Sequence, residues 1–449
     1  MITTPDQRES PRTDLGRARI RRAARATPAF AAPDSASWPH TRCPASSIVD
    51  WVLDLTRLRA DIPAYDNATW PTPVFLDSAG SSLPPRPVLD AVTGHLRRET
   101  EIGGYRAANE RLDDLESVKA AIGTLINADP SGIALSDSAT RAWSDFFYAV
   151  PLAPGDRILV SEADYASNAI ATLQRAQATG AVVEQIPSDE AGQLDLDALA
   201  AMLDERVKLV SLVHAPTNGG LVNPVGEAAR IAHRVDALVL LDACQSAGQL
   251  PLDVAELDVD AMSATGRKWL RGPRGTGFLY VRPELAATME PTRLDLHSAA
   301  WVGPREYRLA ADASRFEFWE CDVAARLGLG AAVRYLLDHG PDEVYAAISA
   351  NAQQLRKTLA EIPEVTVRDL GARHSGIVSF TIDGWIPVDI RDRLLAQDIT
   401  VTVSHRGSTL LDMSARRLDS VVRASPHCFV SPDELERFTE AVTGLATGR

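Results

Sequence analysis

The residues best suited to chemistry are a lysine and an aspartate that lie 26 residues apart. Lys268 stands in the segment 265–269, just before the glycine-rich stretch 272–277, and Asp242 follows the mostly apolar run 235–241. A lysine amine can join the aldehyde of pyridoxal phosphate (PLP), and an aspartate can hold the pyridine nitrogen of that cofactor protonated, so that the ring accepts electrons. The pair predicts a PLP site and chemistry on an amino acid. Taken alone, Lys268 would be interpreted as an ordinary surface lysine, so the catalytic interpretation depends on the residues around it.

Short apolar runs alternate with helical stretches between residues 131 and 281. This alternation predicts an α/β fold with a mostly parallel sheet and helices on both faces. Ligands of such sheets bind outside the carboxyl ends of the strands, and polar residues follow several of these runs. We therefore expect these polar residues to converge on one edge. The runs are 133–135, 157–160, 181–183, 207–213 and 237–241, and the polar residues that follow them are 136–140, 161–165, 214–218 and Asp242.

Four segments supply further candidate contacts to the cofactor or the substrate. Ala139 and Thr140 open a helix after a strand, where backbone N–H groups favour a phosphate; an ordinary helix cap would use the same residue types. Tyr165 is placed to stack on an aromatic ring or to be a half-buried tyrosine. Gln245 could reach the ring hydroxyl. Arg423 is a charge in an apolar strand, so its partner is either a core acid or the α-carboxylate of a substrate.

Bulk composition excludes several classes of protein. The chain has 449 residues, 45% hydrophobic and 24% charged, which is ordinary for a soluble globular protein of two or three domains. A net charge of −14 argues against nucleic-acid binding. No apolar run is long enough to span a membrane, and the first residues lack a secretory signal. Four separated cysteines without a CxxC pair indicate neither a disulfide framework nor a metal site, and favour the cytoplasm.

The organisation along the chain predicts three parts. Residues 1–45 carry eight arginines against four acids and few large apolar residues, which predicts a disordered basic arm or an over-called start; targeting and partner binding are the alternatives. Residues 46–295 are predicted to form the large PLP-binding domain, beginning with a short helix over 47–54. Residues 296–449 are predicted to form a smaller α+β domain, with a loop-rich connection up to residue 320.

Together these residues resemble the class V, fold type I, aminotransferase family, which includes cysteine desulfurases, kynureninases and isopenicillin-N-epimerase-like enzymes. The resemblance runs from about residue 74 to the C-terminus. Within the family the chain is most similar to the ergothioneine-pathway C–S lyases that cleave hercynylcysteine sulfoxide, and to lincosamide-pathway PLP enzymes that process cysteine S-conjugates. The stretches that carry this similarity are 76–80, 101–105, 267–275, 281–286 and 423–427.

The resemblance implies a seven-stranded sheet with a smaller C-terminal domain, PLP as cofactor, and a homodimer. It implies that Asp242 contacts the pyridine nitrogen, that Lys268 holds the cofactor and that Arg423 binds the substrate carboxylate. Further contacts to the cofactor are implied at positions that match the family, with Thr140, Thr265 and Arg267 at the phosphate, Tyr165 stacked on the ring and Thr217 near it.

The chain departs from the family pattern at two places, which affect the expected reaction mechanism and the expected contact with the neighbouring subunit. Desulfurases use a nucleophilic cysteine on the loop before the late arginine, but the corresponding stretch 403–410 has none. A persulfide mechanism is therefore not expected, and Cys244 and Cys428 are interpreted as buried small hydrophobes. Segment 319–322, Trp-Glu-Cys-Asp, replaces the Gly-Thr with which many members reach the phosphate of the neighbouring subunit.

These observations lead to a functional hypothesis: a PLP-dependent lyase that cleaves the C–S bond of a cysteine S-conjugate or its sulfoxide by β-elimination. Lys268 acts as the base at Cα, and the products are a thiol or sulfenate, pyruvate and ammonia. Tyr105 and His405 are candidate contacts to the group on the sulfur, although both residue types are more often structural. The alternatives are decarboxylation coupled to oxidative deamination, transamination or epimerisation, and a catalytically silent binding protein.

Overall fold

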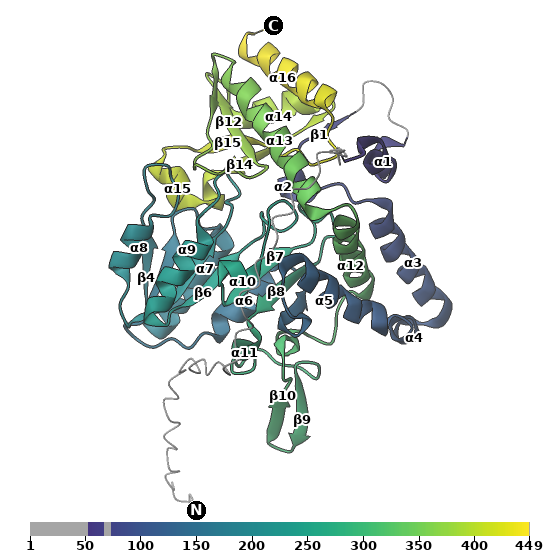
Figure 1. The fold of residues 1–449 in the computed structure, drawn as a ribbon, viewed down its shortest axis with the longest axis vertical. Coiled ribbons are helices and arrows are strands. Elements are labelled where there is room, and N and C mark those ends of the chain that lie inside the picture. Colours follow the sequence, from purple (N-terminus) through teal and green to yellow (C-terminus); the bar gives the residue numbers. More distant parts are fainter. Residues whose placement is uncertain (1–52, 67–72, 449) are drawn as a thin grey trace, which may run out of the picture. The chain divides into compact units, whose positions relative to one another are not determined.

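The computed structural model describes residues 53–66 and 73–448 of the chain (Figure 1). The predicted basic arm, 1–45, lies outside the described residues, as does most of the helix predicted over 47–54. The first described helix, α1 (Leu55–Ala60), begins immediately after that segment.

A seven-stranded sheet lies at the centre of the described chain and confirms the predicted α/β class. Its strand order is β2-β8-β7-β6-β5-β3-β4, and β8 runs antiparallel to both of its neighbours while the other strands are parallel. Parallel strands covered on both faces read as nearly continuous apolar runs, so they are easy to predict. The strands are β2 (Ile133–Ser136), β3 (Arg157–Ser161), β4 (Val182–Ile186), β5 (Val207–Val213), β6 (Leu238–Asp242), β7 (Ala261–Thr265) and β8 (Gly277–Val281).

Alternate side chains of the central strands belong to two separate apolar cores. On β6, Leu240 packs in one core, whereas Val239 and Leu241 pack in the other. Successive side chains of a strand point to opposite faces, so a strand buried on both sides needs apolar residues throughout. Helices α6 (Ala139–Ala149) and α7 (Ala166–Thr179) contribute to the first core, and α5 (Leu112–Ile126), α8 (Leu196–Met202) and α9 (Val225–Ala232) contribute to the second.

Helix α12 (Val323–Asp338) packs against α3 (Arg86–Ile102) and α5. Small residues allow this approach, because a Cβ on Gly328 would lie 2.6 Å from Val92 Cγ2 and 2.7 Å from Pro273 Cγ. Side chains at these distances would overlap, so the helices could not pack as closely with any larger residue.

A second sheet of four antiparallel strands, in the order β11-β12-β15-β14, forms the C-terminal part. The prediction of an α+β unit in this region agrees with these elements. They are β11 (Val365–Val367), β12 (Val378–Ile382), β14 (Thr402–His405), β15 (Ser420–Ala424), α13 (Pro341–Ala360), α14 (Pro387–Leu395) and α16 (Pro432–Ala446).

Packing crosses the predicted domain boundary at residue 295 in both directions. Strand β1 (Val74–Phe75) pairs in parallel with β13 (Ile399–Thr400), and Ile62 lies in the same apolar core as Phe380 of the C-terminal sheet. Conversely, α12 follows the boundary in sequence but packs on helices that precede it. The core of the C-terminal sheet and the cores of the central sheet are therefore each built from residues on both sides of position 295. The division into 46–295 and 296–449 stays a prediction.

The region predicted as loop-rich is largely irregular, and it also contains a β-hairpin that was not predicted, β9 (Ala299–Gly303) and β10 (Glu306–Leu309). In Figure 1 the hairpin projects away from the central sheet. Trp301 at its centre is 82% exposed, and both strands are largely solvent-facing. A strand pair without a buried face lacks the apolar alternation on which strand prediction depends.

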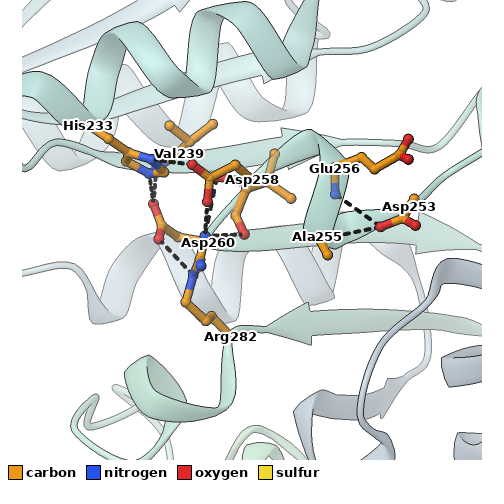
Figure 2. Close-up of polar contacts among 9 residues, drawn as sticks. His233, Val239, Asp253, Ala255, Glu256, Asp258, Asp260 and Arg282 are labelled. Atoms are coloured by element: carbon orange, nitrogen blue, oxygen red, sulfur yellow. Dashed lines mark hydrogen bonds and ion pairs between the residues drawn. The ribbon is translucent and has the colours of Figure 1, made fainter. Parts of the chain in front are cut away.

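A polar network joins β6, β7 and β8 at the ends of these strands that lie opposite to the end of β6 where Asp242 stands. Figure 2 shows its side chains. His233 contacts Asp258 at 3.2 Å and Asp260 at 2.9 Å through its two ring nitrogens. Arg282, just after β8, donates to the Asp258 carboxylate at 2.9 Å, and Val239 N of β6 donates to Asp260 at 2.8 Å. The pKa of His233 is raised, chiefly by its hydrogen bond to Asp260, so the network favours a charged imidazole.

Short helices connect these larger elements, and among the described residues no helix has both the length and the apolar character needed to cross a membrane. They are α2 (Ser78–Ser81), α4 (Gly104–Asn109), α10 (Val254–Leu257), α11 (Pro283–Ala286) and α15 (Leu410–Ala415), with single 3-10 turns at Pro63–Tyr65, Pro130–Gly132, His233–Val235, Ala313–Phe316 and Arg406–Ser408.

Candidate active site

The candidate site is a pocket at the carboxyl edge of the central sheet. Asp242 ends β6, and Lys268 lies on the turn that follows β7. All nine residues predicted to contact the cofactor line this pocket, so residues separated by more than a hundred positions meet as expected from the strand ends. The residues that line it are Ser138, Ala139, Thr140, Tyr165, Val213, Ala215, Thr217, Asp242, Cys244, Gln245, Thr265, Arg267 and Lys268.

The glycine-rich stretch brings the lysine turn against the start of α6. Gly272 N donates to Gly266 O at 2.7 Å, which closes the turn around Lys268. At Gly277 a Cβ would lie 2.8 Å from Ala139 N, so a larger residue would push β8 away from the helix. The glycines thus place the lysine and the helix N-terminus at one pocket.

Lys268 faces the pocket as an unpaired amine. Its side chain is half-buried, and Nζ forms no hydrogen bond or ion pair with any residue that the structure describes. Burial lowers the pKa of Lys268, and the positive charges of Arg267 and Arg423 act in the same direction, while Cys244 and Asp242 oppose it. A buried amine without an acceptor is favoured in its neutral form, which is the form that attacks carbonyls and accepts protons.

Asp242 is held in place by two hydrogen bonds. Its Oδ1 accepts from Cys244 N and its Oδ2 accepts from Asn168 Nδ2, both at 2.9 Å. Asp164 lies nearby, and burial together with the charge of Asp242 raises the pKa of Asp164 to about 8. Asp164 belongs to the polar segment 161–165 that was expected at this edge, but no role was predicted for it, and Asn168, in the first turn of α7, was not predicted at all. Local sequence gives no sign that either residue lies close to Asp242.

The start of α6 separates a capping residue from a residue available to a ligand. Ser138 is the N-cap, and its hydroxyl accepts from Arg141 N at 3.2 Å. Thr140, in the first turn, is exposed and its hydroxyl bonds to no described residue. The capping alternative therefore applies to Ser138. Thr140 remains free to bind an anion together with the N–H groups at this helix end.

Across the turn, the side chains of Thr265 and Arg267 already have protein partners. Thr265 Oγ1 donates to Thr276 O at 3.3 Å, and Arg267 donates to the carbonyl of Gly80. Arg267 keeps further N–H groups on the same guanidinium, since Arg carries five donors. It can therefore hold the turn and still bind an anion in the pocket.

Arg423 is a buried guanidinium whose donors are partly used. Nη1 donates to Thr217 O at 3.0 Å and to Thr217 Oγ1 at 2.7 Å, and Nη2 contacts Asp77 Oδ1 at 3.3 Å. Nε is buried without a hydrogen-bond partner among the described residues. The pKa of Asp77 is raised, chiefly because the carboxyl group is buried, and the charge of Arg423 opposes this shift. Of the two alternatives for its partner, the structure shows the half-buried acid Asp77, while Nε has no partner among the described residues and Arg423 is not among the residues that line the pocket.

Gln245 joins the arginine to the pocket. Its Nε2 donates to Thr217 Oγ1 at 3.2 Å and to Ala79 O at 3.1 Å, and its Oε1 accepts from Trp269 Nε1 at 3.0 Å. Every polar atom of the Gln245 side chain is thereby oriented by the protein. Such a prearranged side chain loses little entropy when a ligand binds.

Tyr105 and His405 do not line the pocket of the described chain. The Tyr105 ring is 75% exposed and lies 5.8 Å from that of Trp319, and His405 is exposed at the end of β14. Their predicted contact with the group on the substrate sulfur stays a prediction. Tyr165 is in the pocket lining and partly exposed there.

The cysteines differ from one another. Cys428 is buried, as expected, and burial raises the pKa of its thiol to about 11. Cys244 is half-buried and lines the pocket, which corrects its interpretation as a fully buried hydrophobe. Burial and the neighbouring Asp242 raise the pKa of the Cys244 thiol, so it is poorly suited to act as a thiolate nucleophile.

Comparisons with known proteins show which proteins this chain is similar to. The chain is 30% identical to a cysteine desulfurase of Dickeya dadantii over 406 residues, which cover 87% of this chain and 96% of that protein. It is 29% identical to a probable cysteine desulfurase of Synechocystis, with 86% and 94% of the two chains covered.

Solved structures extend the comparison. The cysteine desulfurase of Thermococcus onnurineus superposes with a TM-score of 0.80 at 26% identity, covering 88% of this chain and 98% of that one. The cystine C–S lyase C-DES, solved with its product cysteine persulfide, superposes with a TM-score of 0.74 at 25% identity, covering 83% and 98%. Another C-DES structure contains glycine covalently linked to its PLP cofactor. The sequence family described as Aminotransferase class-V matches residues 74–438, and the chain belongs to this family.

Proposed function

We propose that the protein is a PLP-dependent carbon–sulfur lyase that acts on a cysteine S-conjugate or its sulfoxide. The observation that carries the proposal is the unpaired amine of Lys268, placed in one pocket with Asp242 and beside Arg423. Relatives that act on cysteine support the C–S bond as the point of attack. The products are a thiol or sulfenate, pyruvate and ammonia.

PLP fits the donors that the pocket presents. Asp242 is a carboxylate suited to a protonated pyridine nitrogen, and Lys268 is an amine suited to the cofactor aldehyde. Thr140, the α6 N-terminus and Arg267 suit a phosphate dianion, because backbone N–H groups and a guanidinium are donors without acceptor capacity.

The residues of this chain supply the remaining steps. Bound PLP supplies an acceptor for the electron pair at Cα. The Nε of Arg423 binds the substrate carboxylate, and Lys268 accepts the Cα proton as a neutral amine. The C–S electron pair leaves with the sulfur. Aminoacrylate remains, and water converts it to pyruvate and ammonia.

Desulfurase chemistry is the main rival, because the curated relatives described above are desulfurases. That chemistry transfers sulfur to a protein thiolate. The stretch 403–410 carries no cysteine, and the raised pKa of Cys244 disfavours its thiolate. We therefore propose elimination with release of the sulfur group. The narrower substrate assignments, hercynylcysteine sulfoxide or a thiosugar conjugate, remain part of this proposal.

The test is to incubate PLP-loaded protein with a small panel of cysteine S-conjugates and their sulfoxides and to identify the products. Elimination predicts equal amounts of pyruvate and ammonia. Carbon dioxide would indicate decarboxylation, and a keto acid that depends on an added acceptor would indicate transamination. Alanine formed from free cysteine in a parallel reaction would indicate desulfurase chemistry. Lys268→Ala is the inactive control. If the purified protein binds no PLP, all of these enzymatic hypotheses are refuted, because each requires the cofactor.

We also propose a homodimer. Support comes from apolar side chains on the surface of α3 and α4 and near α12, where Leu89, Leu96, Tyr105 and Trp319 are exposed. Such clusters on a soluble protein mark contact surfaces. Light scattering of the purified protein should give twice the chain mass. A single-chain mass at micromolar concentration would contradict this.

A further inference from the structure

A second carboxyl group, that of Asp164, lies close to Asp242 but outside the pocket lining, although the chemistry needs only one. Asp164 is on the connection between β3 and α7 and is only 3% exposed. Its Oδ1 accepts from Tyr165 N at 2.9 Å, while its Oδ2 is buried without a hydrogen-bond partner among the described residues. An ionised oxygen in that position would be desolvated and unpaired, which is costly.

Asn168 connects this second carboxyl to the first. It lies in the first turn of α7, is 2% exposed, and donates from Nδ2 to Asp242 Oδ2 at 2.9 Å. The same amide also interacts with Asp164. Thr172 Oγ1 donates to the Asn168 carbonyl at 2.8 Å.

The electrostatics of the pair favour one proton. Burial raises the pKa of Asp164 first, and the negative charge of Asp242 raises it further, to about 8. The other charged or titratable groups around Asp242 are Lys268 and Cys244, and no cation contacts Asp164 directly within the described chain. At neutral pH, burial and the nearby Asp242 therefore favour the neutral acid form of Asp164.

We propose that Asp164 and Asn168 are positioning residues that fix the orientation of Asp242 at the cofactor pocket. This inference rests on the proposed PLP function. Asn168 holds Asp242 Oδ2 by a hydrogen bond, and the protonated Asp164 leaves the site with one carboxylate rather than two. Neither residue contacts the pocket itself.

A consequence follows for cofactor binding at alkaline pH. When Asp164 ionises, its carboxylate competes with Asp242 for the Asn168 amide, so Asp242 is held less firmly at the pocket. By linkage, PLP affinity falls as pH rises through about 8. One proton taken up per cofactor bound gives a limit of about a tenfold change per pH unit above that value.

The experiment measures the dissociation constant of PLP for the apo protein from pH 6.5 to 9.5, by absorbance, in wild type and Asp164→Asn. The asparagine is neutral at every pH, as the protonated acid is at pH 7. We expect equal constants at pH 7 and a wild-type constant that is about tenfold weaker than that of the variant at pH 9. A ratio that stays constant across this range would overturn the role of Asp164.

Asn168→Leu tests the other residue independently. It should weaken PLP binding about tenfold at pH 7, because Asp242 loses a hydrogen bond to a charged group. Ser167→Ala, a change on the same turn, is the matched control and should leave binding unchanged. If the Asn168 and Ser167 variants bind PLP equally tightly, the proposed role of Asn168 in positioning Asp242 is overturned. If wild type binds no PLP at any pH, the proposed function fails; if it binds PLP and only these differences are missing, this inference alone fails.

Discussion

Replacing Arg423 by Gln should remove most of the recognition of the substrate carboxylate. The guanidinium offers Nε without a partner and Nη2 with one long contact of 3.3 Å, so a carboxylate can accept two charge-assisted hydrogen bonds. Each such bond contributes about 1.5–3 kcal/mol, and taking values at the low end gives about 3–4 kcal/mol for the pair. This corresponds to a loss of about 10² to 10³ in kcat/KM.

The assay is the initial rate of pyruvate release from a cysteine S-conjugate, with the bound PLP measured in the same sample. A matched substrate, the corresponding S-substituted cysteamine, lacks the carboxylate, so its PLP-dependent proton exchange at the amine-bearing carbon should be equally slow in both proteins. Arg423→Lys keeps the charge without the fork and should lie between wild type and Arg423→Gln.

Two results would refute the reasoning. Arg423→Gln within about threefold of wild-type kcat/KM, at full PLP occupancy, would show that the carboxylate binds elsewhere. A similar loss on the cysteamine compound would show that the variant disturbs the pocket rather than carboxylate binding. Asp77→Asn separates the structural part, because it removes the anion at Nη2 while leaving the Nε donor.

Three further predictions concern the lysine, the pocket cysteine and the network at the far edge of the sheet. Lys268→Ala should abolish the absorbance band near about 420 nm that an imine of PLP gives, and a retained band would contradict the assignment. Cys244→Ser should keep pyruvate release within a few-fold, whereas loss of turnover with full PLP would favour a thiol mechanism. His233→Gln should destabilise the protein more at pH 6 than at pH 8.5, because a pKa raised on folding adds stability below about 6.5 that is lost as pH rises through the folded value. Urea unfolding midpoints at both pH values check this, and an equal loss at both would contradict it.

Much of the site could be predicted because its residues occupy strand ends. Asp242 follows β6, Thr140 follows β2 and Lys268 follows β7, and the geometry of a parallel sheet brings such ends together. The apolar run of each strand marks its position in sequence, since both faces are covered. Topology and a simple alternation of residue types therefore suffice for these contacts.

Other features depended on contacts that local sequence does not encode. The hairpin β9–β10 has little buried surface, so its sequence lacks the alternation of apolar and polar residues that predicts a strand. Asn168 and Asp164 read as ordinary residues at a helix start, and their link to Asp242 exists because β3 and β6 lie on either side of β5. The availability of Arg423 Nε likewise depends on Thr217 and Asp77, which lie 206 and 346 residues away.

The sequence by itself determined the α/β class, the lysine–aspartate pair and the absence of a cysteine in 403–410. Each of these features depends only on residue types and on their spacing along the chain. Tertiary structure alone decided the protonation and the availability of the groups. The pKa of Lys268 falls and that of Asp164 rises because both are desolvated, and burial arises only when distant segments pack together. Charge in this pocket is thus a property of the fold rather than of the residues that line it.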